Sequence, residues 1–579
     1  MNAKGLTLKA FDQFRLKSCI DFKPRDSEEY YIHVKKLNGC YSYIGKVISN
    51  GQNISIGSNC DSISIVEHEF LHALGFYHEQ SRYDRDDYVT IVNENIREGY
   101  ENNFDKQSNE TTTTQGVPYD FWSVMHYGTG YFSNGNGSTI ITKDPKFQDV
   151  IGQRLEVSPK DALELNLLYK CKSTIAFQMT CSFRDETMCQ MTSCSQSGLG
   201  WEMVTNVTGG PVSDHTNLPS GSGEQSKIFK SNIACVYFKT FPDNELKYVL
   251  FLSNFLMPPT LMSCEDVGYF MHVSTASGEE GDSAWLETHR MSLNREHHVQ
   301  CLQFYYFHSG KMSDHLNIWI REFQNELDLK GTLRLMGQID GGPTKQWKLH
   351  HVSLNATKHF QVEFEVCKGA GSSTGGFSID DINLSEIECP HVTMQLDDFE
   401  RNWDASDYGA SKYSTRYYSS GGYAYKLAIE LYNSSFGLFV QLVSGENDNW
   451  LEWPCTERQV TFKMLDQNAN IQLQMSKQFS ITSDLSSYVW DNPRLVGLPY
   501  VDDNGETIFA GSMYGRSTFS DKNESKTREF LKGGSVIFTF SFQDITALIN
   551  GSALPIPQVG QVNIKYPPKE LKEGPCSSR

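Results

Sequence analysis

Apolar residues recur at helical spacing at the start of the chain and again around residue 70. Residues 1–19 show helix-like periodicity with charges throughout. In residues 62–76, "SISIVEHEFLHALGF", Phe70, Leu71 and Leu74 would form the buried side of a helix. Gly75 follows, and glycine adopts positive φ without steric cost. The pattern therefore predicts a buried helix that ends at Gly75, where the chain turns back.

Apolar and polar residues alternate in short runs after residue 180. These runs are "CSFRDETMCQM" (181–191), "CLQFYYFHSG" (301–310), "DHLNIWIREF" (314–323), "WKLHHVSL" (347–354) and "FQVEFEV" (360–366). Such alternation predicts an antiparallel β-sandwich over 180–390. A second β-rich unit spans 391–552, and the Pro- and Lys-rich tail 553–579 reads as extended or disordered. We expect a multidomain fold, in which a unit over 1–171 precedes two antiparallel β-sandwich domains.

Composition limits the function classes. A chain of 579 residues holds about three or four domains, and a net charge of −19 argues against binding to nucleic acid or to an anionic membrane. No apolar run reaches the roughly 18 to 20 residues of a membrane span; the nearest, 248–257, is half that length.

Cysteines and glycosylation signals indicate an oxidising compartment. The fourteen cysteines contain no C-x-x-C pair, which is typical of disulfides in a secreted or luminal protein. Nine sequons agree with this interpretation: Asn53, Asn109, Asn136, Asn206, Asn355, Asn383, Asn433, Asn523 and Asn550. No signal peptide is visible, and this absence, taken literally, indicates a cytosolic protein. We expect instead an extracellular protein, secreted or at the cell surface, whose recorded sequence lacks upstream residues.

Three histidines follow the spacing of a metal site. His68 and His72 lie one helical turn apart, and His78 comes three residues after Gly75. Three neutral imidazoles leave one position of a tetrahedral zinc ion open, as in catalytic sites. Zinc lowers the pKa of a bound water to about 7, and Glu69 is placed to accept its proton. Three core or surface histidines remain the alternative.

The extended motif resembles a known family. H-E-x-x-H-x-x-G-x-x-H (68–78), with "SVMHY" (123–127) downstream, is the metzincin pattern with its Met-turn. Glu79 and the following "QSRYDRDDYV" resemble the astacin family of metzincins. The resemblance implies an α+β protease domain with one zinc ion. It places Met125 beneath the zinc, and makes Tyr127 a further zinc ligand that swings away to stabilise the oxyanion.

The later units resemble adhesion-type modules. Residues 375–390, "GGFSIDDINLSEIECP", resemble a MAM domain, and "NDNWLEWPCTERQVTFKMLDQN" (447–468) resembles a MATH (TRAF-like) domain. Astacin, MAM and MATH in this order are typical of the meprins. The family implies a zinc metalloendopeptidase acting on proteins and peptides, joined by disulfide into dimers or larger oligomers through Cys264. It also implies four intrachain disulfides: Cys19–Cys171, Cys40–Cys60, Cys181–Cys189 and Cys301–Cys389.

The sequence departs from this family in several places. Astacins bury the mature N-terminal ammonium beside the residue equivalent to Glu79, and Met1 cannot be that partner. Either water solvates Glu79 or the sequence lacks upstream residues, and we favour the second interpretation. Residues 219–263 form an atypical insertion in the MAM unit, which is either a real surface insertion or retained non-coding sequence. Arg154 either keeps an arginine of the substrate pocket or is a structural ion-pair partner. Tyr100 and Ser62 replace arginines of beta-type meprins, so we expect a weaker preference for acidic substrates. The expected absence of upstream residues makes a catalytically inert adhesion or scaffold protein the competing interpretation, and the intact zinc motif argues against it.

Overall fold

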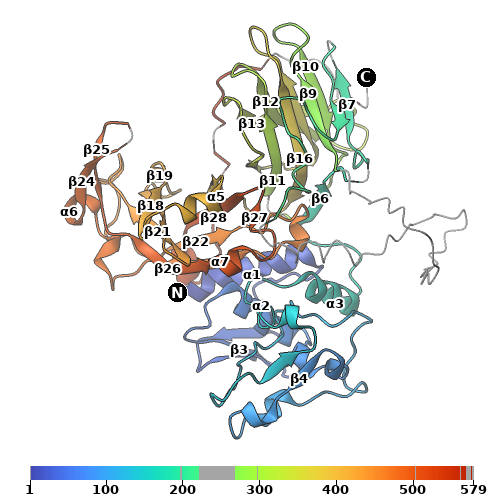
Figure 1. The fold of residues 1–579 in the computed structure, drawn as a ribbon, viewed down its shortest axis with the longest axis vertical. Helices are drawn as coiled ribbons and strands as arrows, with labels where there is room; N and C mark the ends of the chain where they lie inside the picture. The colour runs from blue at the N-terminus through green and yellow to red at the C-terminus, as the bar shows by residue number, and fades with distance from the viewer. Residues whose placement is uncertain are drawn as a thin grey trace, which may run out of the picture.

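The computed structural model describes residues 2–184, 186–195, 198–220, 268–296, 298–502, 504–557, 559–560, 562–568 and 576. Most of the predicted insertion 219–263, together with Cys264 and Cys235, lies outside the described residues. The described chain forms an N-terminal domain, drawn in blue and cyan, and two β-sandwiches, drawn mainly in green and in orange to red (Figure 1).

Three helices organise the N-terminal domain: α1 (Asn2–Lys17), α2 (Ile63–Ala73) and α3 (Pro159–Tyr169). α2 is the predicted histidine helix, and the Ser62 side chain caps its N-terminus by accepting a hydrogen bond from the backbone N–H of Ile65. α3 begins with a capping box between Ser158 and Asp161. The strands are β1 (Ile32–Lys35), β2 (Cys40–Tyr41), β3 (Gln52–Ile56), β4 (Val89–Ile91) and β5 (Ile140–Thr142). They form a three-stranded sheet, β1-β3-β2, and the pair β4-β5.

The middle domain is the predicted antiparallel sandwich. One sheet has the order β13-β12-β15-β10-β7, and the other has the order β14-β11-β16-β9-β8, with β6 on β16. The strands are β6 (Phe177–Cys181), β7 (Thr192–Ser195), β8 (Glu202–Val204), β9 (Phe270–Ser274), β10 (Ser283–Glu287), β11 (Gln300–His308), β12 (His315–Phe323), β13 (Thr332–Ile339), β14 (Lys348–Leu354), β15 (His359–Cys367) and β16 (Gly376–Ser385). Apolar side chains from both sheets share one core, which includes Phe304, Ile318 and Phe364.

One predicted strand of this domain is wrong. After β6 ends at Cys181, the described residues form no further strand before Thr192. The Cys181–Cys189 disulfide closes a loop of only eight residues, and Phe183, Glu186 and Gln190 have positive φ. Left-handed residues turn the chain and break an extended ladder.

The third domain is the second antiparallel sandwich. Its sheets are β17-β28-β22-β23, with β27 on β28, and β18-β20-β21-β26, with β19 on β20; β24 and β25 form a separate hairpin. The strands are β17 (Val392–Leu396), β18 (Ala410–Tyr413), β19 (Tyr417–Tyr418), β20 (Ala424–Leu431), β21 (Ser435–Leu442), β22 (Arg458–Met464), β23 (Lys477–Thr482), β24 (Leu498–Val501), β25 (Thr507–Ala510), β26 (Tyr514–Asp521), β27 (Leu531–Lys532) and β28 (Ser535–Asp544). Short helices join them: α5 (Phe399–Asp404), α6 (Pro493–Val496), α7 (Lys522–Ser525) and α8 (Thr546–Ile549).

The third domain packs directly against the N-terminal domain. Leu155 belongs to the hydrophobic core of the third domain, and Trp122 packs against the same core. Glu156 is buried at this interface, where one carboxylate oxygen accepts a hydrogen bond from the backbone N–H of Ser476 at 3.2 Å. The Lys463 ammonium lies 3.5 Å from the same carboxylate. The loops that carry Trp122 and Leu155 are thus held from outside their own domain.

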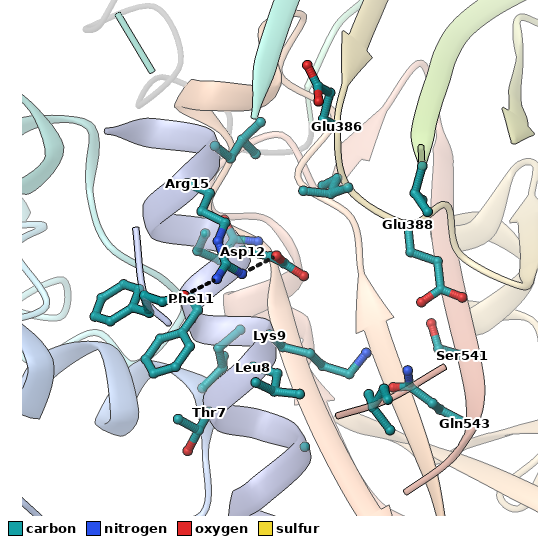
Figure 2. A pocket seen from close by; sticks show the side chains of 18 of the residues that line it. Thr7, Leu8, Lys9, Phe11, Asp12, Arg15, Glu386, Glu388, Ser541 and Gln543 are labelled. Carbon is teal, nitrogen blue, oxygen red and sulfur yellow. Dashed lines mark hydrogen bonds and ion pairs between the residues drawn. The ribbon is translucent and has the colours of Figure 1, made fainter. Parts of the chain in front are cut away.

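All three domains meet around a cavity of about 1030 Å³. α1 forms one wall, and Figure 2 shows Lys9 extending from it toward Glu388, Ser541 and Gln543. On the same helix, Arg15 donates a hydrogen bond to Asp12 at 2.9 Å. Polar side chains therefore line the junction of the domains.

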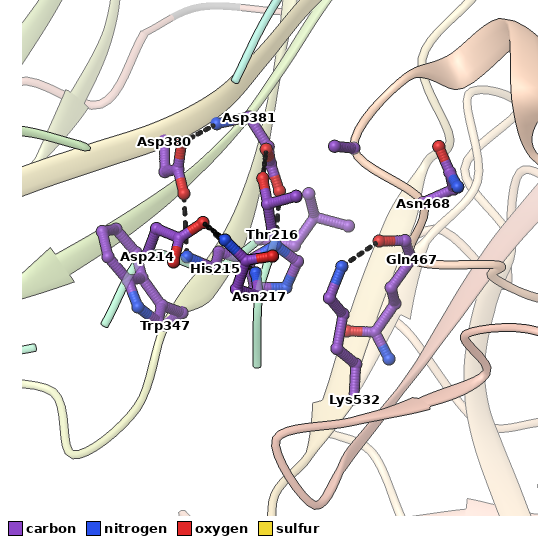
Figure 3. Close-up of polar contacts among 12 residues, drawn as sticks. Asp214, His215, Thr216, Asn217, Trp347, Asp380, Asp381, Gln467, Asn468 and Lys532 are labelled. Atoms are coloured by element: carbon purple, nitrogen blue, oxygen red, sulfur yellow. Dashed lines mark hydrogen bonds and ion pairs between the residues drawn. The ribbon is translucent and has the colours of Figure 1, made fainter. Parts of the chain in front are cut away.

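A buried polar network joins the two sandwiches (Figure 3). Asp214, Asp380 and Asp381 are all buried, and the His215 imidazole lies 2.6 Å from Asp381. Burial lowers the pKa of His215 to about 4, so the neutral ring donates its Nδ1–H to that carboxylate. Lys532 of the third domain donates to the carbonyl oxygen of Gln467 at 3.0 Å and lies beside this network.

Asn383 also joins the two sandwiches, although it lies in a sequon. Its side chain is buried, donates to the carbonyl oxygen of Ala469 at 2.8 Å, and accepts from the backbone N–H of Ile471 at 3.2 Å. We predict that Asn383 carries no glycan in the folded secreted protein, because a glycan requires an accessible amide. Glycopeptide mass spectrometry checks this, with the exposed Asn433 as the internal comparison; occupancy at Asn383 would contradict the observed packing.

Five disulfides cross-link the described residues. Four are the pairs that the family resemblance implies: Cys19–Cys171, Cys40–Cys60, Cys181–Cys189 and Cys301–Cys389. The fifth joins Cys194 to Cys576, which sequence reasoning left unassigned. In the described part of the tail, the backbone N–H groups of Lys565 and Tyr566 donate hydrogen bonds to the side chain of Gln338 at 2.9 Å. Among the described residues, no helix has the length and apolar character needed to cross a bilayer.

Candidate metal centre and active site

Two of the three predicted histidines project from α2, one helical turn apart. Gly75 has a φ of +108°, and it turns the chain so that His78 returns toward the helix. The ring centroids of His68 and His72 are 4.7 Å apart, and that of His78 lies 4.6 Å from His72 and 5.2 Å from His68. The structure therefore brings the three imidazoles together.

The hydrogen bonds of the imidazoles aim their ligand atoms at one point. Nδ1 of His68 lies 2.8 Å from the carbonyl oxygen of Val124, and Nδ1 of His72 lies 2.7 Å from that of Phe76. Each Nδ1 therefore carries the proton, which leaves the lone pair on Nε2. Nε2 of His72 and Nε2 of His78 are 3.2 Å apart. Two ligand nitrogens on a tetrahedral zinc ion are separated by about 3.3 Å, given Zn–N bonds of about 2.0–2.1 Å. The donor set fits zinc.

Burial keeps these ligands neutral. It lowers the pKa of His68 to about 3 and that of His72 below its ordinary value. Burial also lowers the pKa of His78, and the two neighbouring histidines act in the same direction. Neutral imidazoles are the form that binds a metal.

Glu69 follows the first histidine and is only 4% exposed. Burial raises the pKa of its carboxyl to about 7, and Arg154 acts in the opposite direction. Oε2 of Glu69 is buried without a hydrogen-bond partner among the described residues. Such an atom is costly unless a ligand or water satisfies it, and a carboxyl with a pKa near 7 is matched to proton transfer at neutral pH.

The Met-turn lies next to the histidines, since the carbonyl oxygen of Val124 accepts a hydrogen bond from His68. Met125 is buried in the core that also contains Phe70 and Leu71 of α2. Asp161 of α3 holds this turn, because its carboxylate accepts hydrogen bonds from the Ser123 hydroxyl and, at 2.9 Å, from the backbone N–H of Val124. Sequence reasoning missed Asp161; its signal was the pattern S-x-x-D of a helix cap, Ser158 to Asp161.

Tyr127 lies against the third histidine. Its ring centroid is 4.4 Å from that of His78 and 5.0 Å from that of Tyr131. The side chain of Gln80 holds the backbone, since its Oε1 accepts from the N–H of Tyr127 at 3.0 Å. Burial raises the pKa of Tyr127 to about 12, so the phenol is protonated at neutral pH and available as a donor.

The residues predicted for the substrate pocket occupy different places. Arg154 lies close to the site, and its Nη1 donates to the carbonyl oxygens of Gln153 at 2.7 Å and Val124 at 3.3 Å. Tyr100 is 39% exposed and stacks on Phe132, which contacts Tyr127 in turn.

Glu79 has hydrogen-bond partners within the described residues. Its Oε1 accepts hydrogen bonds from Arg82 at 3.2 Å and from the backbone N–H of Asp120 at 2.7 Å. The chain forms a 3-10 turn at Glu79–Ser81, which returns Arg82 to the carboxylate. Burial raises the pKa of Glu79, and Arg82 acts against this shift. Both residues line a cavity of about 230 Å³ together with His78 and Glu164.

Comparisons with known proteins agree with this site. Residues 1–170 match the Astacin peptidase family, 252–390 match the MAM domain, meprin/A5/mu, and 391–542 match the MATH domain.

Several named relatives share this arrangement or part of it. The chain is 41% identical to Meprin A subunit beta of Mus musculus over 564 residues, which cover 96% of this chain and 73% of that protein. It is 36% identical to Meprin A subunit alpha of Mus musculus over 569 residues, or 95% of this chain and 69% of that one. It is also 51% identical to Zinc metalloproteinase nas-34 of Caenorhabditis elegans over 144 residues, which cover 25% of this chain and 24% of that protein. With its three converging imidazoles, the chain belongs to the meprin family of astacin-type zinc metalloendopeptidases.

Proposed function

We propose that His68, His72 and His78 hold the zinc ion and that Glu69 is the general base for peptide-bond hydrolysis. The observation that carries this assignment is the convergence of three neutral imidazoles beside a buried carboxylate oxygen with no hydrogen-bond partner among the described residues. When bound, zinc supplies Lewis acidity and lowers the pKa of water. Glu69 accepts the proton of the attacking water and returns it to the leaving amine.

Tyr127 and Met125 have supporting roles in this proposal. The Tyr127 phenol, protonated and next to His78, donates a hydrogen bond to the oxyanion that develops on the substrate carbonyl. Met125 forms an apolar floor, which Asp161 fixes through the Met-turn backbone. The carbonyls of Val124 and Phe76 orient two of the zinc ligands.

Removal of zinc provides the first test. We predict that dialysis against a strong chelator abolishes cleavage of a quenched peptide by the purified chain, and that one equivalent of zinc per chain restores it. His72→Ala should abolish zinc binding under the same conditions, because it removes one of three ligands. Full cleavage by zinc-free protein would refute the assignment. The competing interpretation, an inert scaffold, requires zinc-loaded protein that cleaves nothing.

Substrate preference follows from Arg154. We propose a weaker preference for acidic residues than a pocket with three arginines would have, because the donors of Arg154 are already engaged by backbone carbonyls and by Tyr131. A free guanidinium binds a carboxylate through two parallel hydrogen bonds, whereas an engaged one has fewer donors to offer. Paired peptides that differ only in Asp or Asn next to the scissile bond measure this preference.

We also propose that the protein is extracellular and joined through Cys264 into a disulfide-linked dimer or larger oligomer. Five disulfides among the described residues support an oxidising compartment. The position of Cys264 in the sequence, where meprins join subunits, supports the dimer. Electrophoresis without reductant, compared between the wild type and Cys264→Ser, tests the linkage; equal mobility of the two would refute it.

A further inference from the structure

Tyr131 is an exposed aromatic residue that covers a buried one. Its ring stacks on that of Tyr127 with centroids 5.0 Å apart and an interplanar angle of 21°. Tyr131 is 39% exposed, whereas Tyr127 is 7% exposed. Tyr131 therefore forms the solvent side of this pair, whereas Tyr127 lies next to the imidazole of His78.

Arg154 anchors Tyr131 from the other end of the side chain. Its Nη2 donates to the Tyr131 hydroxyl at 3.1 Å, and its guanidinium carbon lies 5.6 Å from the ring centroid. The Nη1 of the same guanidinium binds the carbonyl oxygens of Gln153 and Val124. Because a guanidinium is planar and its donors are fixed in one fork, these contacts together set the position of the phenol.

Arg154 also shares a hydrogen-bond acceptor with the proposed zinc ligand His68. The carbonyl oxygen of Val124 that accepts from Arg154 at 3.3 Å also accepts from Nδ1 of His68 at 2.8 Å. The backbone near Tyr131 is fixed as well, since its carbonyl oxygen accepts from the Thr139 hydroxyl at 2.8 Å. Tyr131 is thus held at its hydroxyl and at its backbone.

Two glycines leave the space for this arrangement. A Cβ at Gly128 would lie 3.3 Å from the Tyr131 ring, and a Cβ at Gly152 would lie 2.3 Å from the Cα of Gly128. Gly152 also has a φ of +84°. A side chain at Gly152 would collide with the backbone at Gly128, so the segments that carry Tyr131 and Arg154 approach closely because Gly152 lacks one.

We propose that Tyr131 is a positioning residue for catalysis, which with Arg154 holds the Tyr127 ring in the orientation that presents its hydroxyl to the reacting carbonyl. The inference rests on the proposed role of Tyr127 as an oxyanion donor. Once Tyr127 has moved away from the zinc ion, a ring that Tyr131 holds in place stabilises developing charge better than one that must still be ordered.

Kinetics of a double-mutant cycle test how Tyr131 acts. Tyr131→Ala should lower kcat about three- to tenfold, the worth of one stacked aromatic pair, with KM changed less than about twofold. Tyr131→Phe keeps the stack and loses the hydrogen bond with Arg154, so its kcat should lie between those of Tyr131→Ala and the wild type. In the Tyr127→Phe background, Tyr131→Ala should cost less than about twofold. An equal loss in both backgrounds, or a loss confined to KM, would overturn the proposal.

Hydroxyl-radical footprinting provides a readout that needs neither zinc nor activity. In zinc-free protein, Tyr127 should be oxidised faster in Tyr131→Ala than in the wild type, and at an intermediate rate in Tyr131→Phe. Buried Tyr119 is the internal reference, and Tyr83→Ala, which removes another exposed tyrosine, is the matched control. Unchanged protection of Tyr127 in Tyr131→Ala would overturn the proposal even if the wild type is an active protease. If the wild type cleaves nothing, the proposed function fails, and footprinting still decides whether Tyr131 covers Tyr127.

Discussion

Glu69→Gln should lower kcat for a quenched peptide by about 10³-fold, within the 10² to 10⁴ that general acid–base catalysis contributes. Glutamine keeps the size of the side chain and loses the ability to accept a proton. The zinc content should stay at one ion per chain, because the three imidazoles are unchanged. Steady-state kinetics and elemental analysis of the same sample measure both quantities.

Glu94→Gln is the matched control, since Glu94 is an exposed glutamate outside the site, and it should retain wild-type kcat. A fall of less than tenfold in Glu69→Gln with zinc retained would mean that another group accepts the proton. A loss of zinc together with activity would instead mean that Glu69 acts through the metal site.

The same variant should change stability with pH in the zinc-free protein. Burial raises the pKa of Glu69 to about 7, above the ordinary glutamate value of 4.5. The folded state therefore binds more protons than the unfolded state between these values, and stability falls as pH rises from 4.5 to 7. Glu69→Gln should remove this loss, so the variant gains up to about 3 kcal/mol at pH 7 and nothing at pH 4. Denaturant titrations at the two pH values compare it with the wild type.

Arg321→Met should destabilise the middle domain by about 3–5 kcal/mol, because it leaves the Glu363 carboxylate buried without its charged partner. The guanidinium contacts both oxygens of Glu363, with Nη2 to Oε2 at 3.0 Å, and both residues are almost fully buried. The pair joins neighbouring strands β12 and β15. Differential scanning calorimetry of the full chain should show the transition of this domain shifted down by about 10 °C.

Arg334→Met provides the matched comparison. Arg334 is 38% exposed in its ion pair with Glu322 and lies in the same sheet. Exposed pairs contribute about 0–1 kcal/mol, so this variant should differ little from the wild type. The double change Arg321→Met, Glu363→Leu should recover much of the loss, since it removes the unpaired charge. Equal effects of Arg321→Met and Arg334→Met would show that burial does not govern the cost.

Local patterns explain which features the sequence predicts. The helix that carries His68 and His72 follows from residue spacing alone, because both the ligand geometry and the turn at Gly75 depend on neighbouring residues. The strands at 301–308 and 315–323 follow in the same way from alternation. The Arg82–Glu79 pair is also local, because the two residues lie three positions apart, although the sequence analysis did not predict it.

Sequence patterns do not predict contacts between residues that are far apart in the chain. The Arg154–Tyr131 hydrogen bond joins residues 23 positions apart across two loops, and no periodicity relates them. The loop between Cys181 and Cys189 alternates like a strand, yet its disulfide and left-handed residues prevent one. Packing of Leu155 into the third domain depends on how the domains dock, which sequence alone does not specify.

The third domain lies between Cys194 and Cys576 in the sequence, and a disulfide joins these two cysteines covalently. Hydrolysis of any single peptide bond within residues 391–552 therefore cannot release a fragment until this disulfide is reduced. A nicked molecule would migrate as one species on a gel without reductant and as two species after reduction. Exposed loops of this domain can thus be cut without immediate separation of the protease from its carboxyl-terminal half.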